Sequence, residues 1–339
     1  MKFNSEKKQS IMLYLLEKIA EKNESVAKTV SDNFSINLNT VHTYINELVK
    51  KNIIKRVKRG EYELVNTRHK YKLKRSKGEL NNDTDAFLNC LKPHIEHLPT
   101  NVKSAWGYSF TEIINNAMDH SQAEEVTIIV ETNYLMTRTW IADNGIGIFK
   151  KIEEHFKYNS LDEAICELFK GKLTTDSKNH SGEGIFFSSK LMDNFFIVSS
   201  GKIFTSNRYD NSNIIDMESL NTNGTCVFMS LSNFSHKKPD EIFDLYANED
   251  GGFVKTKIPL KNIFDADPVS RSQAKRISNR LERFKEVILD FEDIQWIGQG
   301  FAHQLFVVFK NEHPDISLLP VNMNESVTKM YHHVTSNDM

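Results

Sequence analysis

The apolar residues of the first fifty positions recur at helical spacing. Over 10–22 they return every three or four positions and form one stripe along a helix: Ile11, Leu15, Leu16 and Ile19. The segment 25–34 supports a second, shorter helix. A third helix can begin at Leu38, and its apolar side carries Val41, Ile45, Leu48 and Val49. The pattern therefore predicts three helices at the start of the chain.

The segment after these helices alternates apolar and basic residues from Asn52 to Val65. The alternation runs through Arg59-Gly60-Glu61, which predicts two strands joined by a tight turn. Three helices followed by such a wing resemble the winged helix-turn-helix family over about residues 5–65. The resemblance rests on this pattern rather than on a unique motif.

The third helix and the wing carry polar and basic side chains of the types that contact base edges and phosphates. The candidate DNA-binding residues are Thr40, His42, Thr43, Asn46, Lys50, Lys58 and Arg59. From Lys50 to Lys77 the chain has 12 Lys or Arg against two Glu, a net charge of +10, whereas the whole chain has −2. This asymmetry favours DNA binding. A small protein-interaction domain with a solvated basic linker is the alternative.

A helix carrying SFTEIINNAMDHS begins near Phe110, in the middle of the chain. Its Glu112 and Asn116 are four residues apart, so they share one face and can reach the same ligand. One of these side chains can act on water while the other holds a metal ion.

Glycine-containing turns follow this helix. The segments VTIIVETN and TWIADNGIGIF predict two strands, and the second opens into a turn. Its Asp143 can accept a hydrogen bond from an adenine amino group, and Gly145 and Gly147 allow close approach to the backbone. In SGEGIFFSSKLM, Gly182 and Gly184 precede a helix whose free N–H groups and dipole suit phosphate. Each fragment alone is weak, but the three in this order indicate a nucleotide pocket.

These segments resemble the N, G1 and G2 boxes of the GHKL superfamily of gyrase, heat-shock chaperone, histidine-kinase and mismatch-repair ATPases. The N box is matched by Glu112 to His120, the G1 box by Asp143 to Gly147, and the G2 box by Gly182 to Gly184. Thr225, in NGTCVFMSL, resembles the family's Gly-Thr element near the adenine. The resemblance covers about residues 81–235 and implies an α/β-sandwich Bergerat fold that binds ATP and Mg²⁺.

The resemblance implies a role for each matching residue. Asn116 would ligate Mg²⁺, Asp143 would bind the adenine amino group, and Glu112 would be the general base. The remaining residues of the ATP-binding set are Gly145, Gly147, Gly182, Gly184 and Thr225. Residues 173–181 take the position of the family's ATP lid, in which Lys178 either reaches a phosphate or stays solvated.

The last third of the chain alternates predicted strands and helices. A helix over 270–284 has the apolar stripe Ala274, Ile277, Leu281 and Phe284, and a buried strand, a turn into another helix and one more strand follow. This order suggests a small α/β unit with right-handed crossovers. SRSQAKRI and DFEDIQWIGQGFAHQLF resemble the STAS-like domains that are fused to ATPases of this type. The turn 296–301 has no hydroxyl residue, which argues against the serine-phosphorylation switch of anti-sigma-factor antagonists.

These segments together predict an α/β multidomain protein. Its expected parts are a winged helix-turn-helix over 1–66, a basic linker over 67–80, a GHKL domain over 81–237 and a STAS-like domain over 250–336. The content of 39% hydrophobic and 26% charged residues is that of an ordinary globular protein. Three widely spaced cysteines and the charged N-terminal segment favour a reduced, cytoplasmic protein without a membrane partner.

The leading functional hypothesis is a cytoplasmic regulator in which ATP-Mg²⁺ binding or hydrolysis controls DNA or partner-protein binding. DNA would bind the winged helix, a protein partner would bind the STAS-like domain, and a homodimer is left open. A serine/threonine kinase of the anti-sigma-factor type is one alternative, since His120 matches a histidine of that branch or serves in helix capping or packing. A nucleotide-sensing module without turnover is another. The histidine-kinase version is disfavoured because Pro93 and Pro99 interrupt any long helix ahead of the N box.

Overall fold

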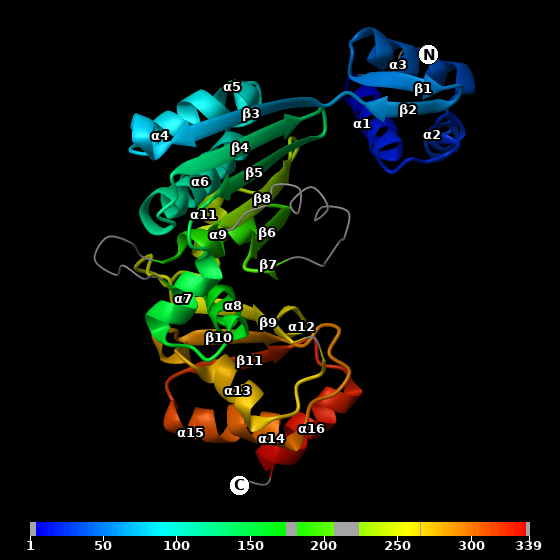
Figure 1. The fold of residues 1–339 in the computed structure, drawn as a ribbon. Helices are drawn as coiled ribbons and strands as arrows, with labels where there is room; N and C mark the ends of the chain where they lie inside the picture. The colour runs from blue at the N-terminus through cyan, green and yellow to red at the C-terminus, as the bar shows by residue number, and fades with distance from the viewer. Residues whose placement is uncertain (1–4, 174–181, 207–223, 265, 337–339) are drawn as a thin grey trace.

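The computed structural model describes residues 5–173, 182–206, 224–264 and 266–336. Three modules follow one another along the chain, with the first and last at opposite ends of the molecule (Figure 1). Helices and sheets occur together in this arrangement, so the predicted multidomain α/β class is confirmed.

The N-terminal module has the three predicted helices and the wing. The helices are α1 (Ser5–Ala20), α2 (Val26–Phe34) and α3 (Leu38–Lys50). The wing strands β1 (Ile54–Lys58) and β2 (Glu61–Leu64) pair antiparallel, and Gly60 between them has a φ of 83°. One apolar cluster holds the module together, but Val49 is 36% exposed, and Tyr44 is buried on α3 instead.

The segment predicted as a basic linker instead forms part of the central sheet. Strand β3 (Thr67–Lys74) pairs antiparallel along its whole length with β4 (Glu125–Thr132), and the short 3-10 helix η1 (Arg75–Lys77) follows it. Tyr71 and Leu73 pack against the core, while basic residues alternate with them toward solvent. Charged residues suit β3, because it is an edge strand.

The central module is a six-stranded antiparallel sheet of order β3-β4-β5-β8-β6-β7, with helices on one face (Figure 1). Its remaining strands are β5 (Met136–Asp143), β6 (Asn194–Ser199), β7 (Lys202–Thr205) and β8 (Thr225–Ser232). Its helices are α4 (Asp83–Ala86), η2 (Phe87–Leu91), α5 (Lys92–Ile95), α6 (Thr100–Asn115), η3 (Asn116–His120), α7 (Ile148–Phe156), α8 (Leu161–Lys170), α9 (Gly184–Leu191) and α11 (Pro239–Asp244).

Helix α6 begins ten residues before the start predicted near Phe110. Its early turns bury Val102, Ala105 and Trp106, and Pro99 immediately precedes its first residue. The chain continues from α6 directly into the π-helix η3. Wider π turns of this kind are frequent at functional sites.

The C-terminal module has a three-stranded parallel sheet of order β11-β10-β9. The strands are β9 (Lys255–Pro259), β10 (Glu286–Asp290) and β11 (Ser317–Val321). The helices are α12 (Leu260–Ile263), α13 (Arg271–Ser278), η5 (Leu281–Arg283), α14 (Gln299–His303), η6 (Gln304–Phe309), α15 (Lys310–Glu312) and α16 (Glu325–Thr335). The predicted alternation of strands and helices is confirmed. Helix α13 ends earlier than predicted, because Arg280 has a φ of 60°, which an α-helix cannot accommodate.

The central and C-terminal modules share an apolar core. Cys166 of α8 and Phe186 and Phe187 of α9 belong to the same buried cluster as Ile258 and Ala274 of the C-terminal module. The two modules are therefore packed together by burial of apolar surface.

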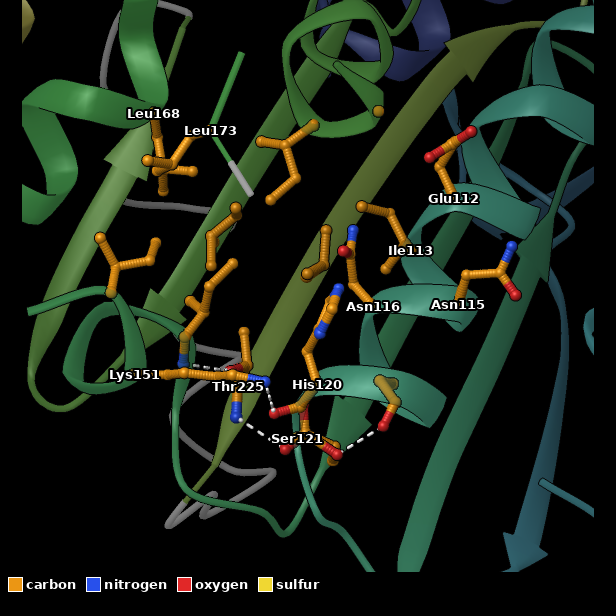
Figure 2. Close-up of a pocket in the computed structure, with 18 of the residues that line it drawn as sticks. Glu112, Ile113, Asn115, Asn116, His120, Ser121, Lys151, Leu168, Leu173 and Thr225 are labelled. Carbon is orange, nitrogen blue, oxygen red and sulfur yellow. Dashed lines mark hydrogen bonds between the residues drawn. The ribbon is translucent and has the colours of Figure 1, made fainter. Parts of the chain in front are cut away.

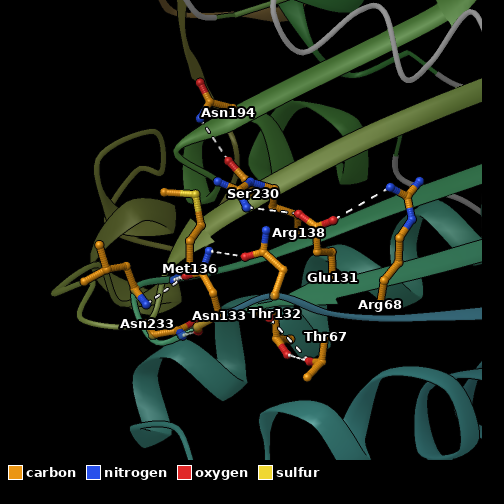
Figure 3. A network of polar contacts seen from close by, with 12 residues as sticks. Thr67, Arg68, Glu131, Thr132, Asn133, Met136, Arg138, Asn194, Ser230 and Asn233 are labelled. Carbon is orange, nitrogen blue, oxygen red and sulfur yellow. Dashed lines mark hydrogen bonds and ion pairs between the residues drawn. The ribbon is translucent and has the colours of Figure 1, made fainter. Parts of the chain in front are cut away.

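The N-terminal module contacts the turn between β4 and β5. Leu135 packs against the apolar core of the N-terminal module, and Asn133 Nδ2 donates to Asn66 Oδ1 at 2.9 Å. Glu131 forms ion pairs with Arg68 at 3.7 Å and with Arg138 at 3.1 Å in the same network (Figure 3). The contacts of Leu135 and Asn133 attach the winged helix to the central sheet, whereas the Glu131 ion pairs join β4 to β3 and β5 within that sheet.

Candidate functional site

A pocket of about 250 Å³ lies between the helices and the sheet of the central module. Its lining comes from α6, η3, β5, α7, α8, α9 and β8 (Figure 2). The sequence-predicted residues that line it are Glu112, Asn116, Asp143, Gly147, Gly182, Gly184 and Thr225. Residues from distant parts of the chain thus meet at one cavity.

Asp143 lies at the end of β5 and is 6% exposed. Its Oδ1 accepts backbone hydrogen bonds from Gly145 N at 2.9 Å and Thr225 N at 3.3 Å. Burial raises the pKa of this carboxyl, and the two backbone hydrogen bonds act in the opposite direction. The Thr225 side chain also hydrogen-bonds this carboxyl and favours its charged form.

Gly145 supports the turn from outside the pocket lining. A Cβ at this position would collide with the carbonyl of Ser121, and Ile146 N donates to the same carbonyl oxygen at 2.9 Å. Gly224, which precedes Thr225, is packed just as closely against Asp143. The sequence NGT, which resembles the family's Gly-Thr element through Gly224 and Thr225, thus lies directly beside Asp143.

Gly147 has a φ of 84° and opens helix α7. The next residue, Ile148, donates its N–H to Thr225 Oγ1 at 2.9 Å. Thr225 therefore fixes the first turn of α7 against strand β8. Glycine suits position 147, because it has no Cβ and adopts a positive φ without a steric clash.

The helical segment Thr100–His120 supplies Glu112, Asn116 and His120 to one side of the pocket (Figure 2). Asn115 is also at the pocket wall, but its amide points away from Glu112 and Asn116 (Figure 2). The amide donates to Asp83 Oδ2 at 3.0 Å. The Glu112 side chain extends from α6 to the first residue of α9. A Cβ on Gly184 would collide with its carboxylate. A carboxylate, an amide and an imidazole are thereby directed to one space.

Several lining residues were missed by the sequence prediction. Lys151 lies one turn after Gly147 on α7 and donates from Nζ to His120 O at 2.8 Å. The apolar part of the wall includes Leu168, Leu173 and Ile185. Lys151 could have been identified from its position four residues after Gly147, one helical turn along α7. The apolar lining residues could not, because no local sequence signal distinguishes them from core residues.

The segment predicted as an ATP lid lies mostly outside the described residues. Leu173 N donates to Gly182 O at 3.0 Å, so the two ends of this segment are adjacent. Lys178 is not among the described residues.

The C-terminal module holds the backbone beside the pocket. Lys172 O accepts from Arg283 Nη1 at 3.0 Å, and Thr256 Oγ1 donates to Lys170 O at 2.8 Å. Gly171, which lines the pocket with a φ of 80°, lies against the ring of Phe253. The position of this pocket wall therefore depends on both modules.

A buried ion pair reinforces this contact. Lys170 Nζ pairs with Glu167 and donates to Arg276 O at 2.9 Å and Asn279 O at 2.7 Å. Lys170 and Glu167 are 1% and 3% exposed. All three donors of the ammonium are thus used, which a buried lysine requires.

The candidate DNA-binding residues lie on α3 and at the wing. The side chains of His42, Thr43, Asn46 and Lys50 are exposed on α3, and Thr40 is partly buried near its start. Lys58 and Arg59 are exposed at the tip of the wing, where Lys58 pairs with Glu61 at 2.7 Å. The structure thus leaves most of these side chains accessible to a large partner.

The N-terminal module is similar to penicillinase repressors. The penicillinase repressor family model matches residues 4–104, which include the winged helix, β3 and the start of α6. The model of a STAS-like domain of unknown function matches residues 273–328. The search of curated proteins finds no match.

These similarities support the two terminal modules. A repressor-like winged helix indicates a DNA-binding regulator, and the predicted STAS-like character of the C-terminal module is confirmed. Both matched ranges exclude the pocket residues from Glu112 to Thr225. Among the described residues, no helix is long and apolar enough to span a membrane.

Proposed function

We propose that this chain is a cytoplasmic, ATP-dependent regulator of DNA binding. ATP and Mg²⁺ would occupy the central pocket, and the repressor-like winged helix would bind DNA. The single observation that carries the proposal is the convergence of the N, G1 and G2 box residues and Thr225 on one cavity. This is the arrangement expected for the Bergerat fold of GHKL proteins.

The donor set of the pocket fits the proposed ligand. Asp143 lines the pocket, and its carboxylate is an acceptor to which an adenine amino group can donate. Asn116 supplies the type of oxygen that Mg²⁺ prefers, and the first turn of α9 supplies N–H groups for phosphate. Mg²⁺, when bound, neutralises phosphate charge.

Glu112 decides whether nucleotide binding leads to chemistry. Its carboxylate is at the start of α9, where the phosphates are expected, and it can accept a proton from a water or a hydroxyl. Glu112 is therefore assigned as the general base for hydrolysis.

Nucleotide in the central pocket can influence the other modules only if the protein has two conformations that bind nucleotide with different affinity. The structure offers two routes: Lys172 is tied to Arg283 of the C-terminal module, and Leu135 of the central sheet packs on the winged helix. A nucleotide that shifts the pocket wall would act on the first contact, and one that shifts β5, which runs from Met136 to the pocket residue Asp143, would act on the second. The STAS-like module would then present a nucleotide-dependent surface to a protein partner.

A second candidate is a protein kinase that phosphorylates serine or threonine on a partner. His120 lines the same pocket as Glu112, which favours this candidate. ATP labelled at the γ-phosphate separates the two, because a kinase transfers label to protein and an ATPase releases it as free phosphate. Nucleotide binding without either product would identify a sensor.

DNA binding measured with and without ATP-Mg²⁺ tests the proposal. In the wild type, nucleotide should change the affinity for DNA, and Asn116→Ala should abolish this change. Asn101→Ala is the matched control, because Asn101 lies on the same helix outside the pocket lining, where its amide donates to Ser235 O at 2.7 Å. DNA binding that is insensitive to ATP and to Asn116→Ala would overturn the proposal.

A further inference from the structure

The pocket wall that follows α8 has a backbone conformation that its own residues do not all favour. Gly171 has a φ of 80° and Lys172 a φ of 55°, so two consecutive residues have a positive φ. Glycine adopts this conformation freely, whereas a lysine is strained in it. A strained residue keeps such a conformation only where surrounding contacts hold it. The contacts of Lys172 therefore determine the shape of this wall.

The contacts that hold Lys172 come from the C-terminal module. Lys172 O accepts hydrogen bonds from Arg283 Nη1 at 3.0 Å and from Arg280 Nη2 at 3.5 Å. In return, Lys172 Nζ donates to Arg283 O at 3.0 Å, and the same ammonium lies 5.1 Å from the centroid of the Phe284 ring. Residues 280–284 thus hold both the backbone and the side chain of Lys172.

Arg280 anchors this segment in the central module. Its Nε forms an ion pair with Glu167 of α8 at 3.3 Å, and its side chain is 13% exposed. Its guanidinium carbon lies 4.3 Å from the centroid of the ring of Phe156, the last residue of α7. The Arg280 side chain is therefore inserted between α7, α8 and the pocket wall, which fixes residues 280–284 relative to the pocket.

The wall in turn contacts the residues that precede α9. Leu173 lies on the side of the pocket opposite Glu112 (Figure 2). Leu173 N donates to Gly182 O at 3.0 Å, and a Cβ on Gly182 would collide with the Leu173 backbone. Gly182 lines the pocket two residues before α9 begins. A displacement of Lys172 would therefore move the wall and the approach to α9, where phosphate is expected.

We infer that Arg283 is a positioning residue for the nucleotide site, contributed by the C-terminal module. Arg283 does not line the pocket, and within the described part of the chain its guanidinium donates only to Lys172 O. The inference rests on the proposed nucleotide binding and adds that the C-terminal module sets its affinity. Because coupling between two sites is reciprocal, nucleotide should also stabilise residues 280–284.

Calorimetric titration of the full chain with ATP and Mg²⁺ tests this inference. Arg283→Ala should raise the Kd for ATP by about two- to tenfold, the range that one hydrogen bond contributes. Arg283→Lys should recover part of the affinity, since an ammonium can donate to the same carbonyl. Arg271→Ala should leave the Kd unchanged, because Arg271 is an exposed arginine of the same module outside the pocket lining.

Hydrogen exchange read by mass spectrometry tests the coupling in the opposite direction. ATP and Mg²⁺ should slow exchange in the peptide that carries residues 280–284 of the wild type, although none of these residues lines the pocket. This protection should be smaller in Arg283→Ala and unchanged in Arg271→Ala. A merely structural role for Arg283 would not produce it.

Three results would overturn the inference while nucleotide binding by the wild type stands. They are an ATP affinity unchanged by Arg283→Ala, no recovery of affinity in Arg283→Lys, and no protection of residues 280–284 by nucleotide. A wild type that binds no ATP would overturn both the inference and the proposed function.

Discussion

Single residues determine what the central pocket can bind, and Asp143 is the residue whose charge most directly affects ligand binding. Its carboxyl is buried, and burial raises its pKa, yet the two backbone donors on Oδ1 favour the charged form. The same group therefore links ligand binding to pH, because only the carboxylate can accept on both oxygens.

The affinity for ATP-Mg²⁺ should fall as the pH is lowered through the raised pKa of Asp143. Protonation has the opposite effect on the fold: a raised pKa means that the folded state binds the proton more tightly, so lowering the pH removes the cost of the buried charge. Titration calorimetry across a pH series measures the first effect, and urea unfolding measures the second. Asp143→Asn should remove both dependences; an unaltered pH profile in this variant would contradict the assignment.

Gly184 provides a second test at the residue scale. Gly184→Ala should weaken nucleotide binding with little change in the free energy of unfolding, because the new Cβ displaces the end of the flexible Glu112 side chain. Gly107→Ala on α6 is the matched control, since its Cβ has its nearest contact at 3.9 Å. It should stabilise the protein by up to about 1 kcal/mol through helix propensity. Titration with ATP and Mg²⁺ and urea unfolding compare the two variants, and equal nucleotide affinities would argue against the crowded geometry at Gly184.

The sequence predicts most accurately those secondary-structure elements that neighbouring residues specify by themselves. The wing turn at Gly60 and the strand ending at Asp143 are confirmed, since glycine and alternating residues specify them locally. Strand β3 was mistaken for a linker, because its basic residues are explained only by pairing with β4, far along the chain. The pocket wall at Leu168 and Leu173 escapes prediction for the same reason: its role depends on tertiary packing.

The buried pair on α8 tests how firmly this element joins two modules. Lys170→Met should destabilise the protein by about 1–3 kcal/mol, because it leaves the Arg276 and Asn279 carbonyls without their donor and Glu167 with Arg280 as its ion-pair partner. Combining it with Glu167→Gln should recover part of this loss. Chemical unfolding measures both variants. A double variant no more stable than Lys170→Met would show that the cost comes from the lost hydrogen bonds to the Arg276 and Asn279 carbonyls rather than from the Glu167 carboxylate.

Helix α3 and the wing should contribute differently to DNA binding. Lys58→Ala or Arg59→Ala should weaken binding to all sequences and reduce the slope of log affinity against log salt by about 1 each. Asn46→Ala should instead lower discrimination between sequences by about 1–3 kcal/mol if it contacts a base. Fluorescence anisotropy at several salt concentrations measures these effects, with Lys285→Ala in the C-terminal module as the control. Variants that match this control would exclude α3 and the wing from the interface.

On the scale of the whole molecule, the pocket lies between a repressor-like module and a STAS-like module, and both are attached to it. The C-terminal module supplies Arg283 and Phe253 to the wall at 171–172, and the winged helix receives Leu135 from the central sheet. This organisation suits control of DNA or partner binding by a ligand of the central pocket.

Calorimetric titration of the full chain with ATP in the presence of Mg²⁺ tests that central claim most directly. The account predicts saturable binding of one ATP per chain, weakened by at least about tenfold in Asp143→Asn, because the adenine amino group loses its charged acceptor. The absence of saturable binding in the wild type, or an affinity unchanged by Asp143→Asn, would contradict it.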